Sequence, residues 1–221
     1  MEIKQFVWDV VDSNSWLIIE GNSGILIDAV ASQEMYREIL SLSSLTIILT
    51  HSHFDHIYGL NKIREIKPDV KVIATCLCSE YLGNIYKNMS ASANAFMFFY
   101  TGSNDVKVEP VICSAADIIF DDEYLFEWEN HQVQLLAFHG HSPDSLIAIV
   151  DNELIFSGDS ILSIPTVTRF PGGSTKRFWE EDVPVLMKMS NKSMVYPGHG
   201  IEGRLGEMIS VNVKPTRYHG K

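Results

Sequence analysis

Three of the chain's eight histidines and one aspartate lie within a single six-residue stretch, HSHFDH, at residues 51–56. His51 and His53 alternate along the chain, so both imidazoles can converge on one side of an extended turn. Asp55 and His56 can direct a carboxylate and a third imidazole to a neighbouring point. A lone histidine is most often a surface or core residue. This spacing instead predicts that one stretch serves two metal ions.

Two metal ions need more than four ligands, so further ligands are expected where other strands end. Three motifs provide candidates after apolar or alternating segments: FHGHSP with His139 and His141, FSGD with Asp159, and YPGHG with His199. Each motif contains glycine beside the candidate, which permits tight turns and close approach to an ion. The spacing of the first of these motifs leaves a choice between His139 and His141.

The segments that position these motifs are mostly short strands with helices between them. Gly21 and Gly24 suit a hairpin turn in the first half, and Ser32 can cap a helix with Met35, Tyr36, Ile39 and Leu40 on one face. Further helices are predicted near 57–66, at 79–87 and near 176–189. Strands are predicted at 16–19, 25–27, 45–49, 70–74, 124–128, 132–138, 146–150, 153–156 and 194–196.

Two rounds of strands followed by helices predict an α/β fold in which two packed sheets have helices outside. No linker or low-complexity stretch divides the chain, so residues 1–221 are interpreted as a single domain.

The ordered motifs HSHFDH, GHS, SGD and PGHG resemble those of the metallo-β-lactamase superfamily, in particular its glyoxalase II-like and thioesterase-like branch. The resemblance covers residues 51–199 and implies an αββα sandwich of two mixed sheets. It leaves His139 outside the ligand set, with either a structural role or a contact to substrate. The ligands that it implies are His51, His53 and His141 for the first metal, Asp55, His56 and His199 for the second, and Asp159 as the bridge between them.

The expected reaction is hydrolysis by a hydroxide that bridges two divalent cations about 3.5–4 Å apart. One metal can also polarise the substrate carbonyl, so no serine or cysteine nucleophile is required. Asp55 is the candidate catalytic residue, because it could orient the hydroxide or pass its proton to the leaving group. Zinc is the first choice of metal, and iron or manganese suits the same ligands.

Composition limits which binding partners and which cellular compartment are expected. A formal net charge of −11 opposes binding to nucleic acid. The N-terminus does not resemble a signal peptide and no run of about 18 apolar residues predicts a membrane span, so the cytoplasm is the expected location. Cys76, Cys78 and Cys113 lack the spacing of a zinc knuckle and are expected to be buried or idle. A small-molecule substrate is the expected partner, and the oligomeric state stays open.

The substrate is less clearly indicated than the metal ligands. The apolar segment 95–100, AFMFFY, belongs to a candidate lid near 84–110, although a core strand or helix fits the same residues. As a lid it would suit an apolar acyl group, so an acyl thioester or ester is preferred. Arg169 could bind a carboxylate or phosphate, or form a surface salt bridge.

Three alternatives to a dinuclear thioester or ester hydrolase remain. They are an iron-dependent oxidoreductase similar to the persulfide dioxygenases, a lactonase, and a metal-bearing ligand-binding regulator. The lactonases that resemble this pattern have a tyrosine soon after the bridging aspartate, whereas Ser160, Ile161 and Leu162 follow Asp159 here. The basic tail, residues 214–221, fits disorder or a partner contact.

Overall fold

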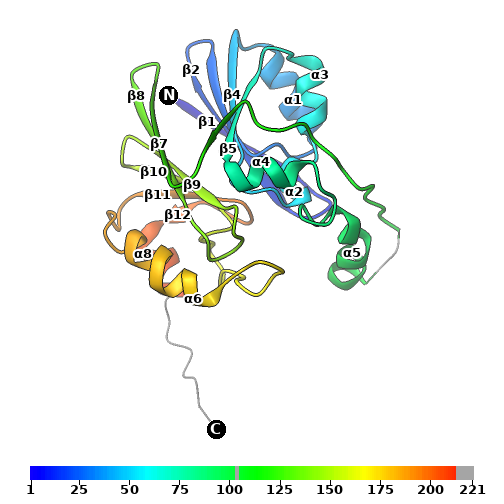
Figure 1. Cartoon of the computed structure of the whole chain (residues 1–221). Helices are drawn as coiled ribbons and strands as arrows, with labels where there is room; N and C mark the ends of the chain where they lie inside the picture. Colours follow the sequence, from blue (N-terminus) through cyan, green and yellow to red (C-terminus); the bar gives the residue numbers. More distant parts are fainter. Residues whose placement is uncertain (103–104, 213–221) are drawn as a thin grey trace.

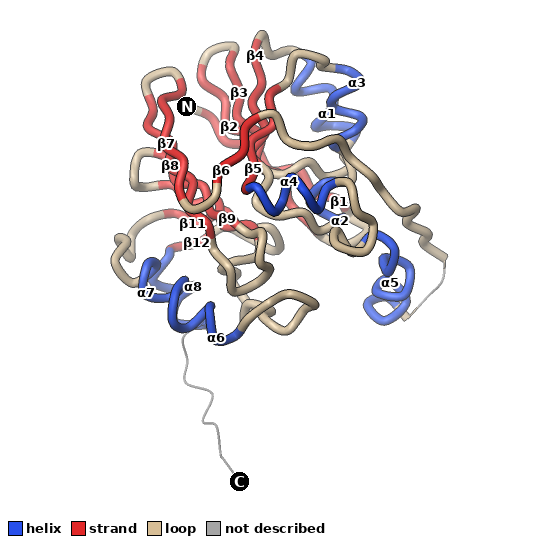
Figure 2. Tube along the Cα trace, viewed as in Figure 1, coloured by secondary structure: helices blue, strands red, loops and turns tan. Residues whose placement is uncertain are grey.

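Two mixed β-sheets face each other in this computed structural model, which describes residues 1–102 and 105–212 (Figure 1). Helices cover the outer sides of both sheets, so the layers run helix, sheet, sheet, helix (Figure 2). The expected αββα sandwich is therefore confirmed. The basic tail, 214–221, and two positions of the candidate lid, 103–104, lie outside the described residues.

The first sheet is built from the N-terminal half of the chain. Its strands, in spatial order, are β1 (Glu2–Trp8), β2 (Ser13–Glu20), β3 (Ser23–Ile27), β4 (Ser44–Ile48), β5 (Lys71–Thr75) and β6 (Ile118–Phe120). β1 to β3 are antiparallel and β3 to β6 are parallel. Gly21 has a φ of +59° in the turn between β2 and β3, a conformation that glycine adopts without strain.

The second sheet comes from the C-terminal half. Its strands are β7 (Glu123–Trp128), β8 (His131–Ala137), β9 (Leu146–Val150), β10 (Leu154–Gly158), β11 (Met194–Pro197) and β12 (Gly203–Arg204). Only β10 and β11 pair in parallel among these described strands. Asp151 and Asn152 both have positive φ in the turn between β9 and β10, as a tight hairpin turn requires.

The helices differ from the sequence prediction in several places. The predicted helix at 57–66 is divided into α2 (Phe54–Ile57) and α3 (Leu60–Ile66), and α4 (Cys76–Leu82) ends five residues before the predicted boundary. The predicted helix at 176–189 is α6 (Thr175–Arg177), a π-helical turn (Phe178–Asp182) and α7 (Val183–Leu186). β1, β6, β12 and α8 (Leu205–Asn212) were not predicted from the sequence. No described helix is long and apolar enough to cross a membrane.

The first helix, α1 (Gln33–Leu40), begins as predicted, because the Ser32 hydroxyl accepts a hydrogen bond from the Met35 amide. Met35 is buried together with Tyr36 and Ile39. Leu40 was predicted to share this face, and that prediction is wrong. Its side chain is exposed at the last position of the helix.

Three groups of buried apolar side chains match the boundaries between the layers. One lies between the first sheet and α1, α3 and α4, and includes Leu26 and Ile63. The second lies between the two sheets and includes Trp16, Leu135 and Phe156. The third lies between the second sheet and α7 and α8. The two sheets are thus held together mainly by apolar contacts.

The three cysteines are free thiols, and two of them, Cys78 and Cys113, are buried. Burial raises the pKa of Cys113 to about 11 and raises that of Cys78 well above its ordinary value. A thiol with such a pKa carries little thiolate at neutral pH and is a poor nucleophile.

We expect Leu135→Ala to lower the free energy of unfolding by about 2–5 kcal/mol, because it opens a cavity between the sheets. The matched control is Leu125→Ala on the adjacent strand β7, whose side chain is exposed. It should change stability by less than about 0.5 kcal/mol. Urea unfolding measures both variants, and equal effects would contradict the placement of Leu135 in the core.

Candidate metal centre

All seven predicted ligand residues lie together where strands of both sheets end. The first sheet supplies His51 and His53, which follow β4, and Asp55 and His56, which lie on α2. The second sheet supplies His141 after β8, Asp159 after β10 and His199 after β11.

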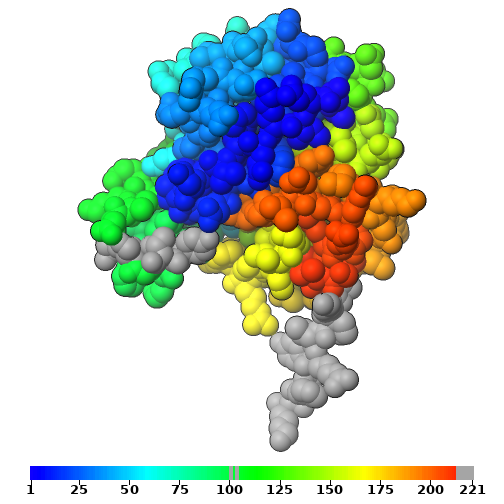
Figure 3. Space-filling model, turned by 180° about the vertical axis from the view of Figure 1, so that it is seen from behind, coloured from blue at the N-terminus to red at the C-terminus, as the bar shows by residue number. Residues whose placement is uncertain are grey.

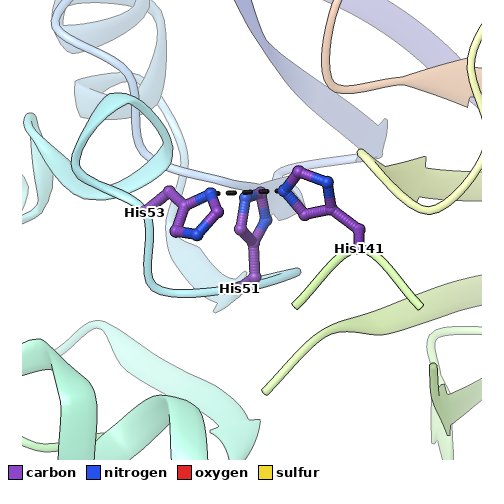
Figure 4. Close-up of side chains that lie close together, drawn as sticks. All are labelled: His51, His53 and His141. Carbon is purple, nitrogen blue, oxygen red and sulfur yellow. Dashed lines mark hydrogen bonds between the residues drawn. The ribbon is translucent and has the colours of Figure 1, made fainter. Parts of the chain in front are cut away.

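His51, His53 and His141 form one group whose ring nitrogens lie within 4.8 Å of one another (Figure 4). His53 Nδ1 is 3.2 Å from His141 Nε2. Two nitrogens that bind one tetrahedral zinc at about 2.0–2.1 Å are about 3.3 Å apart, so this spacing fits two ligands of one ion. His141 Nδ1 donates a hydrogen bond to the Val167 carbonyl, which leaves its Nε2 as an acceptor facing the other two rings.

A second group consists of Asp55, His56 and His199, whose ligand atoms also lie within 4.8 Å of one another. His199 Nε2 is 3.2 Å from Asp55 Oδ2, and His56 Nε2 is 3.6 Å from the same oxygen. His199 Nδ1 donates to the backbone carbonyl of Asp12 at 3.0 Å, so Nε2 is the ring nitrogen that faces the site.

Asp159 lies between the two groups. Its Oδ1 is 3.5 Å from His56 Nε2, and its Oδ2 is 3.6 Å from His199 Nε2 and 3.7 Å from His141 Nε2. One carboxylate therefore reaches histidines of both groups, which is the position that a bridging ligand needs.

The hydrogen-bonding pattern fits bound cations. Five buried side-chain polar atoms in the described residues have no hydrogen-bond partner, and three of them are His51 Nε2, His56 Nε2 and Asp159 Oδ1. Leaving such atoms unpaired is costly, and a metal ion would supply the missing partner. A Cβ at Gly198 would lie 2.4 Å from Asp159 Oδ1 and 2.7 Å from His56 Cε1, so glycine keeps this space open.

Protonation differs between the two groups. Burial, followed by the nearby imidazoles, holds the pKa of His51 well below its ordinary value, and burial and His141 lower the pKa of His53 to about 4. Burial also opposes the charged form of His56, but the carboxylates around it, above all Asp55, raise its pKa to about 10. A cation at the second group would therefore displace protons, whereas His51 and His53 of the first group are neutral imidazoles at pH 7.

Asp28, at the end of β3, supports both groups and was missed by the sequence analysis. Its carboxylate accepts hydrogen bonds from the Thr50 amide at 2.7 Å, the Thr50 hydroxyl at 2.8 Å and His56 Nδ1 at 2.9 Å. Because the Thr50 hydroxyl gives its hydrogen to Asp28, its oxygen accepts from His51 Nδ1 at 3.1 Å. Asp28 thus orients one imidazole in each group, the role of an outer carboxylate at many metal sites.

Asn14, on β2, holds the loop that carries His199. Its side-chain amide donates to the carbonyls of Pro197 and Gly200, both at 2.9 Å, and its backbone amide donates to Gly198 at 2.7 Å. From behind, the N-terminal strands in blue lie directly against the C-terminal segment in orange (Figure 3). No local sequence pattern indicates this contact, because the residues that it joins are more than 180 positions apart.

A pocket of about 390 Å³ opens over the centre, and its lining includes five of the seven candidate ligands: His53, Asp55, His141, Asp159 and His199. Its walls are largely apolar, and α5 (Ala93–Thr101), which extends from the body of the protein, contributes Phe96 (Figure 1). The next residue, Met97, is buried in the first core, so α5 both packs on the protein and lines the pocket. The other apolar side chains in the lining include Val11, Met89, Leu162, Ile164 and Phe170.

Two further candidates lie outside the pocket. His139 is not in the lining, and its Nδ1 donates to the Pro143 carbonyl at 2.9 Å, which favours the structural role. The neighbouring backbone amides of His139 and Gly140 donate to buried Asp182, whose pKa is raised to about 6 by burial. Arg169 is exposed and is also absent from the lining.

An αββα sandwich with a histidine and carboxylate cluster at its strand ends defines a class of metal-binding proteins. The sequence model of the metallo-beta-lactamase superfamily matches residues 8–199, and this chain therefore belongs to that superfamily. The match includes all seven candidate ligands. The superfamily and the clustered ligands together imply divalent metal ions.

Relatives and solved structures agree with this assignment. The chain is 26% identical over 197 residues to "Probable metallo-hydrolase YqgX" of Bacillus subtilis (strain 168), covering 87% of each protein. It is 20% identical over 195 residues to a hydroxyacylglutathione hydrolase of Prochlorococcus marinus (strain NATL1A), covering 85% of this chain and 64% of that protein.

Among solved structures, the BLEG-1 B3 metallo-beta-lactamase superposes with a TM-score of 0.79 at 21% identity, over 96% of this chain and 98% of that one. TTHA1623 in a di-iron-bound form superposes with a TM-score of 0.73 at 23% identity, over 95% and 98% of the two chains. Both similarities show the fold alone.

We expect Asp28→Asn to weaken metal binding by about 10–100-fold, because an amide cannot accept from all three donors as the carboxylate does. Competition with a chromophoric chelator measures the affinity. The matched control is Asp117→Asn, since Asp117 also accepts a backbone hydrogen bond, from Val72, but lies away from the centre. Unchanged affinity in Asp28→Asn would refute the supporting role.

We expect Asn14→Ala to weaken binding of the second metal by about tenfold and to spare the first, because the His199 loop loses two hydrogen bonds and no ligand of the first group is bonded to Asn14. Stepwise metal titration followed by native mass spectrometry separates the two events. Asn61→Ala, which removes a similar bond to the Ile112 carbonyl, is the control. Equal loss at both sites would contradict a selective effect.

Proposed function

We propose that this protein is a dinuclear metal-dependent hydrolase that cleaves a thioester or ester bond of a small substrate with an apolar acyl group. The observation that carries the proposal is the cluster of all seven candidate ligand side chains beneath a largely apolar pocket, which five of them line. Relatives named as metallo-hydrolase and hydroxyacylglutathione hydrolase support the same class of reaction.

His51, His53 and His141 would hold one divalent cation, Asp55, His56 and His199 the other, and Asp159 would contact both. Such a pair of cations lowers the pKa of water towards neutrality and polarises a substrate carbonyl. Zinc is the proposed metal, since imidazole and carboxylate ligands suit it.

Asp55 is the proposed catalytic residue because it is a ligand that also lines the pocket. Burial opposes its ionisation, but His56 and His199 outweigh that effect and hold the pKa of Asp55 well below its ordinary value. Asp55 is therefore a carboxylate at neutral pH, able to accept a hydrogen bond or a proton beside the reacting bond. The apolar walls exclude water from the acyl group and strengthen these polar interactions.

We expect His53→Ala and Asp159→Ala to lose metal and thioesterase activity together, with kcat/KM lowered by at least about a thousandfold. His131→Ala is the matched control. This histidine lies away from the centre, where its Nδ1 is 2.6 Å from Asp151 Oδ2. Metal content is measured by elemental analysis, and activity by thiol release from a panel of acyl thioesters and esters.

Full activity in a metal-free variant would refute the proposed function. Oxygen uptake with a persulfide substrate in place of hydrolysis would favour the iron-dependent oxidoreductase. Elemental analysis of the protein, purified without chelator, decides between zinc, iron and manganese.

A further inference from the structure

A line of aromatic rings leads from the first metal group to the outer wall of the pocket. The Phe170 ring lies 5.9 Å from the His53 ring and 5.7 Å from the His141 ring. The Phe96 ring of α5 lies 6.1 Å from Phe170 on the other side. The side of the pocket formed by Phe96 and Phe170 is therefore apolar from the candidate ligands outward.

The charged groups in the lining are all acidic or belong to the centre. The carboxylates are those of Asp12, Asp55 and Asp159. No lysine or arginine of the described residues lines the pocket, and the side chain of Arg169, next to Phe170, is exposed outside it. Among the described residues that line the pocket, an anionic group on a bound substrate would meet positive charge only at the metal centre, where the reacting carbonyl must lie.

Anionic thiols such as glutathione and coenzyme A carry carboxylates or phosphates several bonds away from the reacting sulfur. Those groups would lie along the outer part of the pocket, against its largely apolar described walls. A carboxylate or phosphate loses its hydration there without gaining a cationic partner, and that loss opposes binding. An uncharged leaving group has no such penalty.

On the basis of the proposed function, we infer that the pocket selects acyl thioesters and esters whose leaving group is uncharged, with the acyl chain packed against Phe96 and Phe170. This specificity differs from that of the relatives named as hydroxyacylglutathione hydrolases, whose leaving group is anionic.

The first test compares three butyryl thioesters with different leaving groups: N-acetylcysteamine, glutathione and coenzyme A. We expect kcat/KM to be at least about tenfold higher for the neutral N-acetylcysteamine thioester than for the glutathione and coenzyme A thioesters. Calorimetric binding of the three matching S-butyl thioethers to the metal-loaded protein should give the same order of affinities. Equal or tighter binding of the glutathione or coenzyme A thioether overturns the inference.

The binding measurement separates the two proposals. Selective binding of the neutral thioether without hydrolysis of any thioester would refute the proposed function and keep the selectivity. Rapid hydrolysis of the glutathione thioester would keep the hydrolase and refute the selectivity.

A positive charge added to the pocket wall should change the preference for uncharged over anionic ligands. Ile164 lines the pocket and is 59% exposed, so Ile164→Lys can place a cation at its rim. We expect the ratio of glutathione to N-acetylcysteamine thioether affinity to rise by about tenfold. Ile112→Lys is the matched control, because Ile112 is 62% exposed and outside the lining, and its ratio should stay unchanged. Equal ratios in the two variants overturn the inference.

Two phenylalanines of α5 provide a second matched pair. Phe96 is 38% exposed and lines the pocket, whereas Phe99 is 85% exposed and does not. We expect Phe96→Ala to reduce the preference for hexanoyl over acetyl N-acetylcysteamine thioesters by about fivefold or more, since apolar contact area is lost. Phe99→Ala should leave this preference unchanged. An unaltered preference in Phe96→Ala refutes the assigned acyl position.

Discussion

The buried carboxylate of Asp28 is the interaction on which the centre depends. It is 1% exposed, has a φ of +59°, and accepts three hydrogen bonds from two residues of the neighbouring loop and helix. A buried carboxylate without such partners would cost several kcal/mol, so the loop after β4 must pass close to the end of β3. The same bonds direct His51 and His56 into different metal groups. The parallel pairing of β3 with β4 therefore determines where both groups lie.

Much of the fold follows from short-range patterns. Alternating or continuous apolar residues predicted most strands, and Gly21 and Gly24 predicted the hairpin between β2 and β3. β6 and β12 were missed because they contain three and two residues, too few to show a period. The helix predicted at 176–189 contains a π-helical turn that places Asp182 under the amides of His139 and Gly140, a contact that no local pattern encodes.

The candidate site likewise contains residues that local motifs predict and residues that only the tertiary structure reveals. The HSHFDH motif and the glycine-containing motifs predicted a gathering of ligands, because strand ends that carry histidine or aspartate are unusual and recognisable. The supporting residues Asp28 and Asn14 have common side chains with no local motif, and their partners lie 22 and more than 180 residues away. The choice between His139 and His141 also depends on tertiary structure, which directs His141 towards His53 and His139 towards Pro143.

The centre receives its candidate ligands from both sheets, and the sheets are otherwise joined mainly by apolar side chains. Ions bound there would link the two halves of the chain, and the unfolded chain could not offer the same ligand geometry. The free energy of ion binding would therefore add to the free energy of folding, by an amount that rises with the concentration of free metal. For this architecture, the supply of metal in its surroundings would regulate the lifetime of the folded protein as well as its catalytic capacity.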